Sequence, residues 1–178
     1  SPIRLEYDVR ALAEQGWTVD FLTLPIGERR EIPGVRIVRA PNLFFVRNIP
    51  IGPSPVKLAF DAVLLVMALG MALRHRYRVV HGVEDAGMVA GVVRVLCRTK
   101  LVFEKHSDPA SHQAGALKNL MLAAYAVVER WIIRCADAVI VTGPGLGDQV
   151  RAVRPDVPTH VISDIPSSLA EPTAGQTA

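Results

Sequence analysis

Residues 128–142 of the chain read VERWIIRCADAVIVT. An apolar helical pattern runs as far as Cys135, Asp137 interrupts it, and the residues from Ala138 to Val141 are apolar without alternation. A short strand that is apolar on both faces and directly follows a helix is typical of a parallel sheet covered by helices. The segment therefore predicts a helix at 116–135 followed by a buried strand at 137–142.

The alternation of helix and strand continues in both directions from this segment. Helices are expected at 4–15, 55–74, 85–98, 116–135 and 148–153, and strands at 17–24, 35–39, 78–82, 99–104, 137–142 and 159–163. This order predicts an α/β, Rossmann-like, doubly wound domain with a mainly parallel sheet and helices on both faces. Residues 1–166 are expected to form this domain, and 167–178 have the composition of a linker or disordered tail.

The composition fits one folded domain and argues against a nucleic-acid partner. Half of the 178 residues are hydrophobic, the formal net charge is +3, and only 6% of residues are aromatic. The small excess of positive charge fits an anionic substrate or an anionic membrane surface. Cys97 and Cys135 lie in apolar helical patterns, so buried free thiols and a cytoplasmic location are expected.

Five segments, taken in order, resemble the N-terminal domain of glycosyltransferase family 4, whose members adopt the two-domain GT-B fold. They read RALAEQGWTV (10–19), YRVVH (77–81), LVFEKHSD (101–108), VERWIIRCADAVIVT (128–142) and VISDIP (161–166). The sequence also departs from the family pattern. The resemblance leads us to expect a first strand and a glycine-rich loop before Arg4 and a C-terminal domain after this one, none of which residues 1–178 include, and Ser163-Asp164 replaces the usual Asn-Gly.

The resemblance implies transfer of a sugar from a nucleotide-sugar donor to an acceptor hydroxyl, with retention, no cofactor and no required metal. This half would orient a sugar or lipid-linked acceptor, while the missing C-terminal domain, or a partner chain in its place, would hold the donor. The chain alone is therefore expected to be inactive. One alternative is a non-catalytic half domain that binds a partner chain or ligand. A second, an unrelated Rossmann-like enzyme or a receiver domain using Asp85, lacks an acidic cluster at a first strand.

Polar residues follow the strand expected at 78–82. In an open parallel sheet ligands bind beyond the carboxyl ends of the strands, so Glu84 and Asp85 are candidates to bind the acceptor hydroxyl. The alternative for Asp85 is a capping role at the start of the next helix.

The strand expected at 99–104 leads into a second polar segment. By the resemblance, His106 occupies the position that lies against the reacting sugar, and it is the candidate catalytic residue. Ser107 and Asp108 beside it are expected to bind the acceptor. The alternative is a loop histidine hydrogen-bonded to nearby backbone. No HxxxH spacing is present, so no metal site is expected.

A glycine-rich segment, TGPGLG at 142–147, precedes the short helix expected at 148–153. Backbone N–H groups at helix N-termini bind phosphate, so Thr142, Gly143 and Gly145 are predicted to lie in the cleft close to a phosphate. The alternative is a tight turn that requires the backbone angles of glycine.

The helix expected at 55–74 is apolar nearly all round and is followed by Arg74, Arg76 and Arg78. We interpret it as a core helix. The alternative is a peripheral contact with the inner face of a membrane. The segment at 42–47, within a proline-rich loop, is the preferred candidate for an exposed apolar contact.

Overall fold

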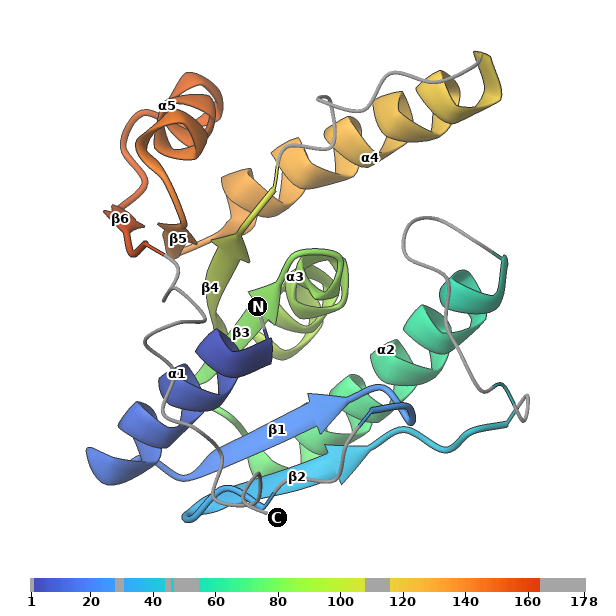
Figure 1. Ribbon diagram of the computed structural model, residues 1–178, viewed down its shortest axis with the longest axis vertical. Helices are drawn as coiled ribbons and strands as arrows, with labels where there is room; N and C mark the ends of the chain where they lie inside the picture. Colours follow the sequence, from blue (N-terminus) through green and yellow to red (C-terminus); the bar gives the residue numbers. More distant parts are fainter. Residues whose placement is uncertain (1, 28–30, 44–45, 47–54, 108–115, 164–178) are drawn as a thin grey trace, which may run out of the picture.

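The computed structural model describes residues 2–27, 31–43, 46, 55–107 and 116–163 (Figure 1). Every helix and strand expected from the sequence is present. In chain order the elements are α1 (Pro2–Glu14), β1 (Val19–Thr23), β2 (Val35–Arg39), α2 (Pro55–His75), β3 (Val79–Val83), α3 (Ala86–Cys97), β4 (Lys100–Lys105), α4 (Ala116–Cys135), β5 (Ala138–Val141), α5 (Pro144–Val153) and β6 (Thr159–Val161). The predicted tail at 167–178, and most of the loop segment at 42–47, lie outside the described residues.

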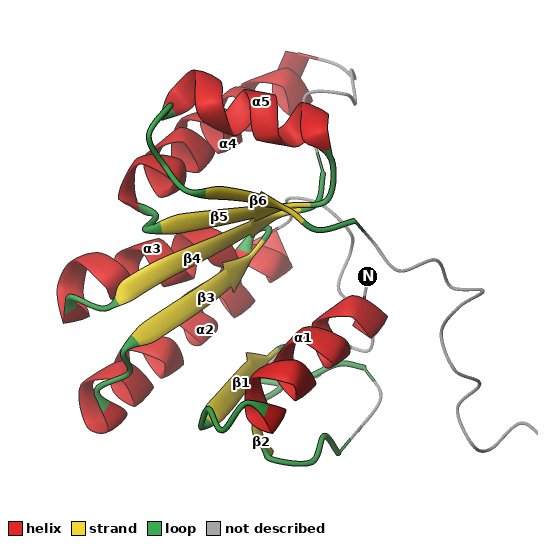
Figure 2. Cartoon of the chain, turned by 90° about the vertical axis from the view of Figure 1, so that its left-hand side faces the viewer, coloured by secondary structure: helices red, strands yellow, loops and turns green. Residues whose placement is uncertain are grey.

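All strand pairs are parallel, as predicted, but the strands form two sheets. One sheet has the order β1-β2 and the other β3-β4-β5-β6. Because β3, β4, β5 and β6 follow one another across the sheet, right-handed crossovers put α3, α4 and α5 on one face. In Figure 2, α1 lies in front of β1, whereas α2 and α3 lie behind the strands. Helices therefore cover both faces, which confirms the doubly wound prediction.

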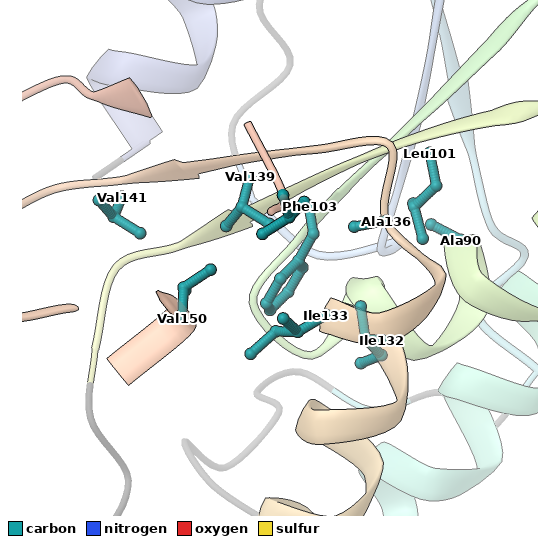
Figure 3. Close-up of a cluster of buried hydrophobic side chains, with 10 residues drawn as sticks. Ala90, Leu101, Phe103, Ile132, Ile133, Ala136, Val139, Val141 and Val150 are labelled. Carbon is teal, nitrogen blue, oxygen red and sulfur yellow. The ribbon is translucent and has the colours of Figure 1, made fainter. Parts of the chain in front are cut away.

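The main core lies between β4, β5 and the helices α3, α4 and α5 (Figure 3). Phe103 of β4 is 1% exposed and Val139 of β5 is 0% exposed. They pack with Ile133 of α4 and Val150 of α5 in one cluster of buried side chains. Successive side chains of a strand point to opposite faces, so Glu104, next to Phe103, points to the other face.

Helix α3 approaches the sheet very closely because small residues line the contact. A Cβ atom on Gly82 of β3 would lie 2.6 Å from the Cβ of Ala90 and 2.8 Å from the Cα of Gly87. A Cβ atom on Gly87 itself would lie 2.5 Å from the ring of Phe103. The close packing of α3 fixes the position of β3 and β4 side by side.

Helix α5 begins four residues earlier than predicted. Pro144 is its first residue, a position that proline favours because its φ is already helical and it has no N–H to leave unpaired. Gly143 at the N-cap has extended backbone angles, and neither it nor Gly145 has a positive φ. The alternative of a turn that requires glycine angles is therefore wrong for these two residues.

Helix α2 differs from the predicted core helix. Phe60 and Leu64 are buried, but Leu58, Val66 and Leu73 are 59%, 71% and 69% exposed. Only 17% of its most apolar window is buried, and within the described residues it is the one helix long and apolar enough to cross a membrane. The core interpretation holds for one face of α2 and is wrong for the opposite face.

The glycine contacts of α3 lead to a stability prediction. Replacing Gly87 by alanine forces a methyl group against the buried Phe103 ring, and overpacking of this kind costs about 1–3 kcal/mol. Gly70→Ala in α2 is the matched control, because nothing lies within 4 Å of its Cβ position and alanine stabilises a helix interior by about 0.5–1 kcal/mol. Urea unfolding measures both. A Gly87→Ala protein as stable as the parent contradicts the close packing.

Candidate functional site

The candidate site lies at the carboxyl-end edge of the four-stranded sheet. Glu84 follows β3, His106 follows β4 and Thr142 follows β5. These three strands are parallel neighbours, so their carboxyl ends meet at one edge. Residues that are far apart in the sequence are thus brought together by the strand order.

Glu84 connects two of the predicted segments. Its carboxylate accepts a hydrogen bond from the backbone N–H of His106 at 2.5 Å and one from the Ser107 hydroxyl at 3.0 Å. The backbone N–H of Glu84 in turn donates to the carbonyl of Glu104. Glu84 has a φ of 51°, a left-handed conformation that is uncommon for a residue with a side chain. This conformation turns the chain from β3 into α3 and leaves the carboxylate facing the end of β4.

Thr142 lies on the other side of the same loop. Its hydroxyl donates to the carbonyl of His106 at 3.2 Å, and its backbone N–H donates to the carbonyl of Lys105. The structure therefore brings Glu84, His106, Ser107 and Thr142 together, and their roles in binding or catalysis stay predictions. Gly143 and Gly145 follow Thr142 at the start of α5, with open space at their Cβ positions.

Asp85 does not join this group. Its carboxylate forms an ion pair with Lys57 of α2 at 2.9 Å, and it is also a hydrogen-bond partner of the Tyr125 side chain. Although Asp85 is the residue at the N-cap of α3, it makes no side-chain capping hydrogen bond, so the capping alternative is wrong. Burial raises the pKa of Tyr125 above its ordinary value, and the Asp85 charge raises it further. Asp108 lies outside the described residues.

Three residues of the site were given no role from the sequence: Arg4, His81 and Glu104. Glu104 is 0% exposed. Its Oε1 lies 2.9 Å from Nε of Arg4 and 2.6 Å from Nε2 of His106, and its Oε2 lies 2.9 Å from Nε2 of His81. The signal available in the sequence was an acidic residue inside an apolar strand, which needs cationic or N–H partners if it is buried.

The partners of Glu104 keep it ionised. Burial favours the protonated form, but hydrogen bonds from His81 and then His106 outweigh it and lower the pKa of Glu104 to about 2. Asp8 of α1 is also close, at 3.5 Å from Arg4, and burial followed by the charge of Glu104 raises its pKa. Arg4 also donates to the carbonyl of Ile162, so α1 is tied to the end of β6.

The side chains of this site are hydrogen-bonding groups. They include two imidazoles, two carboxylates and hydroxyl side chains, groups that can orient a hydroxyl or accept its proton. Among the described residues no group of three or more His, Cys, Asp or Glu side chains is arranged to hold a metal ion.

The Glu104 interactions predict a loss of stability in acid. The pKa of Glu104 is about 2 in the folded chain and has an ordinary value of 4.5, so the unfolded chain binds its proton first as the pH falls. The contribution of Glu104 to the free energy of unfolding is complete above pH 4.5 and disappears as the pH falls to about 2. Urea unfolding across this range should show a shallower pH dependence in Glu104→Gln than in the parent. Equal slopes would exclude the stabilising role, since other carboxylates such as Asp20 and Asp137 titrate in both proteins.

Comparison with known proteins identifies the family. A model of the glycosyl transferase 4-like domain matches residues 3–164. Among solved structures, the sucrose-phosphate synthase of Thermosynechococcus elongatus is similar, with a TM-score of 0.57, 21% identity, and coverage of 90% of this chain and 85% of that chain. At this identity the likeness shows the fold alone, a parallel α/β arrangement that fits one half of a GT-B fold. No curated protein matches the chain. Because the family model covers most of the sequence, the chain belongs to the glycosyl transferase 4-like domain family.

Proposed function

We propose that this chain is the acceptor-side domain of a glycosyltransferase that moves a sugar from a nucleotide-sugar donor to an acceptor hydroxyl. The observation that supports the proposal is the convergence of His106, Glu84 and Ser107 at the carboxyl-end edge of the sheet. Ligands of open parallel α/β domains bind at this edge. The family membership of the chain supplies the reaction class.

In the proposed reaction, the acceptor oxygen forms a bond to the anomeric carbon while the bond from that carbon to the donor phosphate breaks. The acceptor hydroxyl must give up its proton during this step, so a hydrogen-bond acceptor has to be aligned with it. His106 has that role in our proposal, with Ser107 as a second contact to the acceptor. Correct orientation alone can lower a barrier by several kcal/mol, on the order of 7–11 kcal/mol in the best intramolecular cases.

The donor in this proposal is held by a second domain or by a partner chain. No cofactor is required, because the nucleotide-sugar is itself the activated substrate. Thr142 and the start of α5 are the parts of this chain proposed to face the donor phosphates, since free N–H groups at a helix N-terminus favour an anion. The free thiols of Cys97 and Cys135 fit a cytoplasmic location.

The proposed role of His106 is tested by sugar transfer. The protein, together with the domain or partner chain that holds the donor, is incubated with a panel of nucleotide-sugars and hydroxyl acceptors, and the released nucleoside diphosphate is measured. His106→Ala is expected to lower kcat/KM by about 10²-fold or more, the usual contribution of a positioned acid or base. His160→Ala, which removes an exposed histidine of β6, is the control and should leave kcat/KM unchanged. Binding of a partner or ligand without any transfer, even with the donor-holding part supplied, would support the alternative of a non-catalytic half domain.

The exposed face of α2 supports a peripheral membrane contact of the same protein. Leu58, Val66 and Leu73 lie along that face, and Arg74, Arg76 and Arg78 follow at its end. An apolar helix face next to arginines is suited to the interface of an anionic membrane, where each arginine contributes about 1 kcal/mol. A lipid-linked acceptor would be presented at this surface.

Vesicle sedimentation tests the membrane contact. Binding to vesicles that contain phosphatidylserine should exceed binding to pure phosphatidylcholine vesicles, because the arginines need anionic lipid. Val66→Glu should weaken the binding about tenfold, since it puts a charge in the centre of the apolar face. Val127→Glu, at a 58% exposed position of α4, is the matched control. Equal binding of the two variants would contradict a contact through α2.

A further inference from the structure

Glu104 lies between two imidazoles that face it from different elements. His81 belongs to β3, and His106 follows the end of β4. In the register of these strands Val83 pairs with Glu104 and His81 with Val102, so His81 and Glu104 are diagonal neighbours on one face. Both rings contact the carboxylate through the same atom, Nε2, one ring on each oxygen.

An ionised carboxylate can only accept hydrogen bonds, and this one stays ionised at neutral pH because its pKa is about 2. Each Nε2 atom that contacts it must therefore carry a hydrogen. A neutral imidazole holds a single N–H, so its Nδ1 atom is then left with a free lone pair. The carboxylate thus determines which nitrogen of each ring can accept a proton.

Both rings are more exposed to solvent than the carboxylate that they contact. Glu104 is fully buried, whereas the side chains of His106 and His81 are 12% and 28% exposed. Both Nε2 atoms contact Glu104, whereas Nδ1 of neither ring forms a hydrogen bond with the described residues. The ring nitrogens opposite Glu104 are thus the ones placed to meet a ligand.

We propose that Glu104 is a positioning residue that holds His81 and His106 in the same tautomer, with the hydrogen on Nε2 and an accepting Nδ1 presented to the ligand. His81 becomes a second imidazole of the site. The identity of the ligand rests on the proposed function. The hydroxyl group of the sugar acceptor can donate a hydrogen bond to the lone pair of Nδ1. Two such atoms suit a ligand with two neighbouring hydroxyl groups, as in a sugar.

The other charged groups around His81 and His106 cannot take the place of Glu104 in holding these rings. Arg4 and Asp8 approach from α1, and Glu84 binds the backbone of His106 rather than its ring. Arg4 offers Glu104 a cation, which is enough to hold α1 against the sheet. A guanidinium only donates hydrogen bonds, so Arg4 cannot accept the N–H of a ring at Nε2 as the carboxylate does. An experiment can therefore separate the anchoring of α1 by Arg4 from the positioning of the two rings by Glu104.

The test measures the tautomers directly in the ¹⁵N-labelled protein. Two-bond ¹H–¹⁵N spectra at about pH 8, where an ordinary histidine is neutral, distinguish an N–H at Nε2 from one at Nδ1. His81→Gln and His106→Gln assign the two signals. Both rings of the parent are expected to carry the hydrogen on Nε2. A parent ring with its hydrogen on Nδ1 overturns the proposal, and this result needs no variant of Glu104.

The decisive variant is Glu104→Gln. The amide offers one accepting oxygen and one donating NH₂ group, so it cannot accept from both Nε2 atoms. At least one ring must move its hydrogen to Nδ1 or leave its position. Glu129→Gln is the matched control, since it neutralises another largely buried carboxylate, which pairs with Lys105 at 2.6 Å on the other face. Unchanged signals of both rings in Glu104→Gln overturn the proposal.

Two further experiments distinguish positioning by Glu104 from the effects of the residues around it. Arg4→Met removes the cation of α1 and should leave both tautomers in place, whereas a loss of tautomer order there would assign the effect to anchoring. In the sugar-transfer assay Glu104→Gln should lower kcat about tenfold or more, and combining it with His106→Ala should add little, as for residues that act as a unit. A parent that shows both Nε2–H tautomers but transfers no sugar when the donor-holding domain or partner chain is supplied refutes the proposed function and leaves the role of Glu104 intact.

Discussion

A carboxylate that is fully buried and still ionised requires positive charge and N–H donors around it, because removal of an ion from water costs several kcal/mol. In this chain Glu104 meets that requirement with Arg4 of α1, His81 of β3 and the loop residue His106. These partners come from three parts of the chain. The same interaction therefore holds α1 against the sheet, sets the end of β3 and shapes the loop after β4.

The end of β4 is fixed from its other face as well. Lys105 follows Glu104 directly and points to the helical side, where its ammonium group lies 2.6 Å from the Glu129 carboxylate of α4. On this side α3 packs against β3 with glycine at the points of closest approach, so the sheet has no room to shift. A site on such a support keeps its groups in register, which hydrogen-bond recognition of a hydroxyl needs.

Much of the fold is readable from the sequence because its strands are short apolar runs between helices of regular period. The segment at 138–141 is apolar at every position and forms β5, and Gly16 follows the end of α1 with a φ of 85°, a conformation that favours glycine. The features that the sequence did not predict depend on local backbone constraints and on tertiary contacts. The start of α5 depends on Pro144 at its first position, and the exposed face of α2 depends on which neighbours reach it. The spacing of apolar residues in the sequence reveals neither the start of α5 nor the exposed face of α2.

The site was predictable only in part for a similar reason. Polar residues after strands were found because parallel strands end at one edge, and the contact of Glu84 with His106 agrees with that rule. Glu104 looked like the last residue of a strand, where an exposed charge is ordinary. Its burial depends on Arg4, which lies a hundred residues earlier in the sequence and reaches the sheet only in the folded chain.

The charges at this edge also bear on which substrate the domain suits. A diphosphate needs several cations, but the cations near the edge that the structure describes are already engaged by carboxylates. Arg4 is paired with Glu104, Lys105 with Glu129, and Lys57 with Asp61 and Asp85. What this edge presents instead is imidazole and hydroxyl groups, which can hydrogen-bond a neutral hydroxyl. That balance is compatible with the acceptor-side role that we propose, and under that proposal the cations for a donor diphosphate come from outside this set of residues.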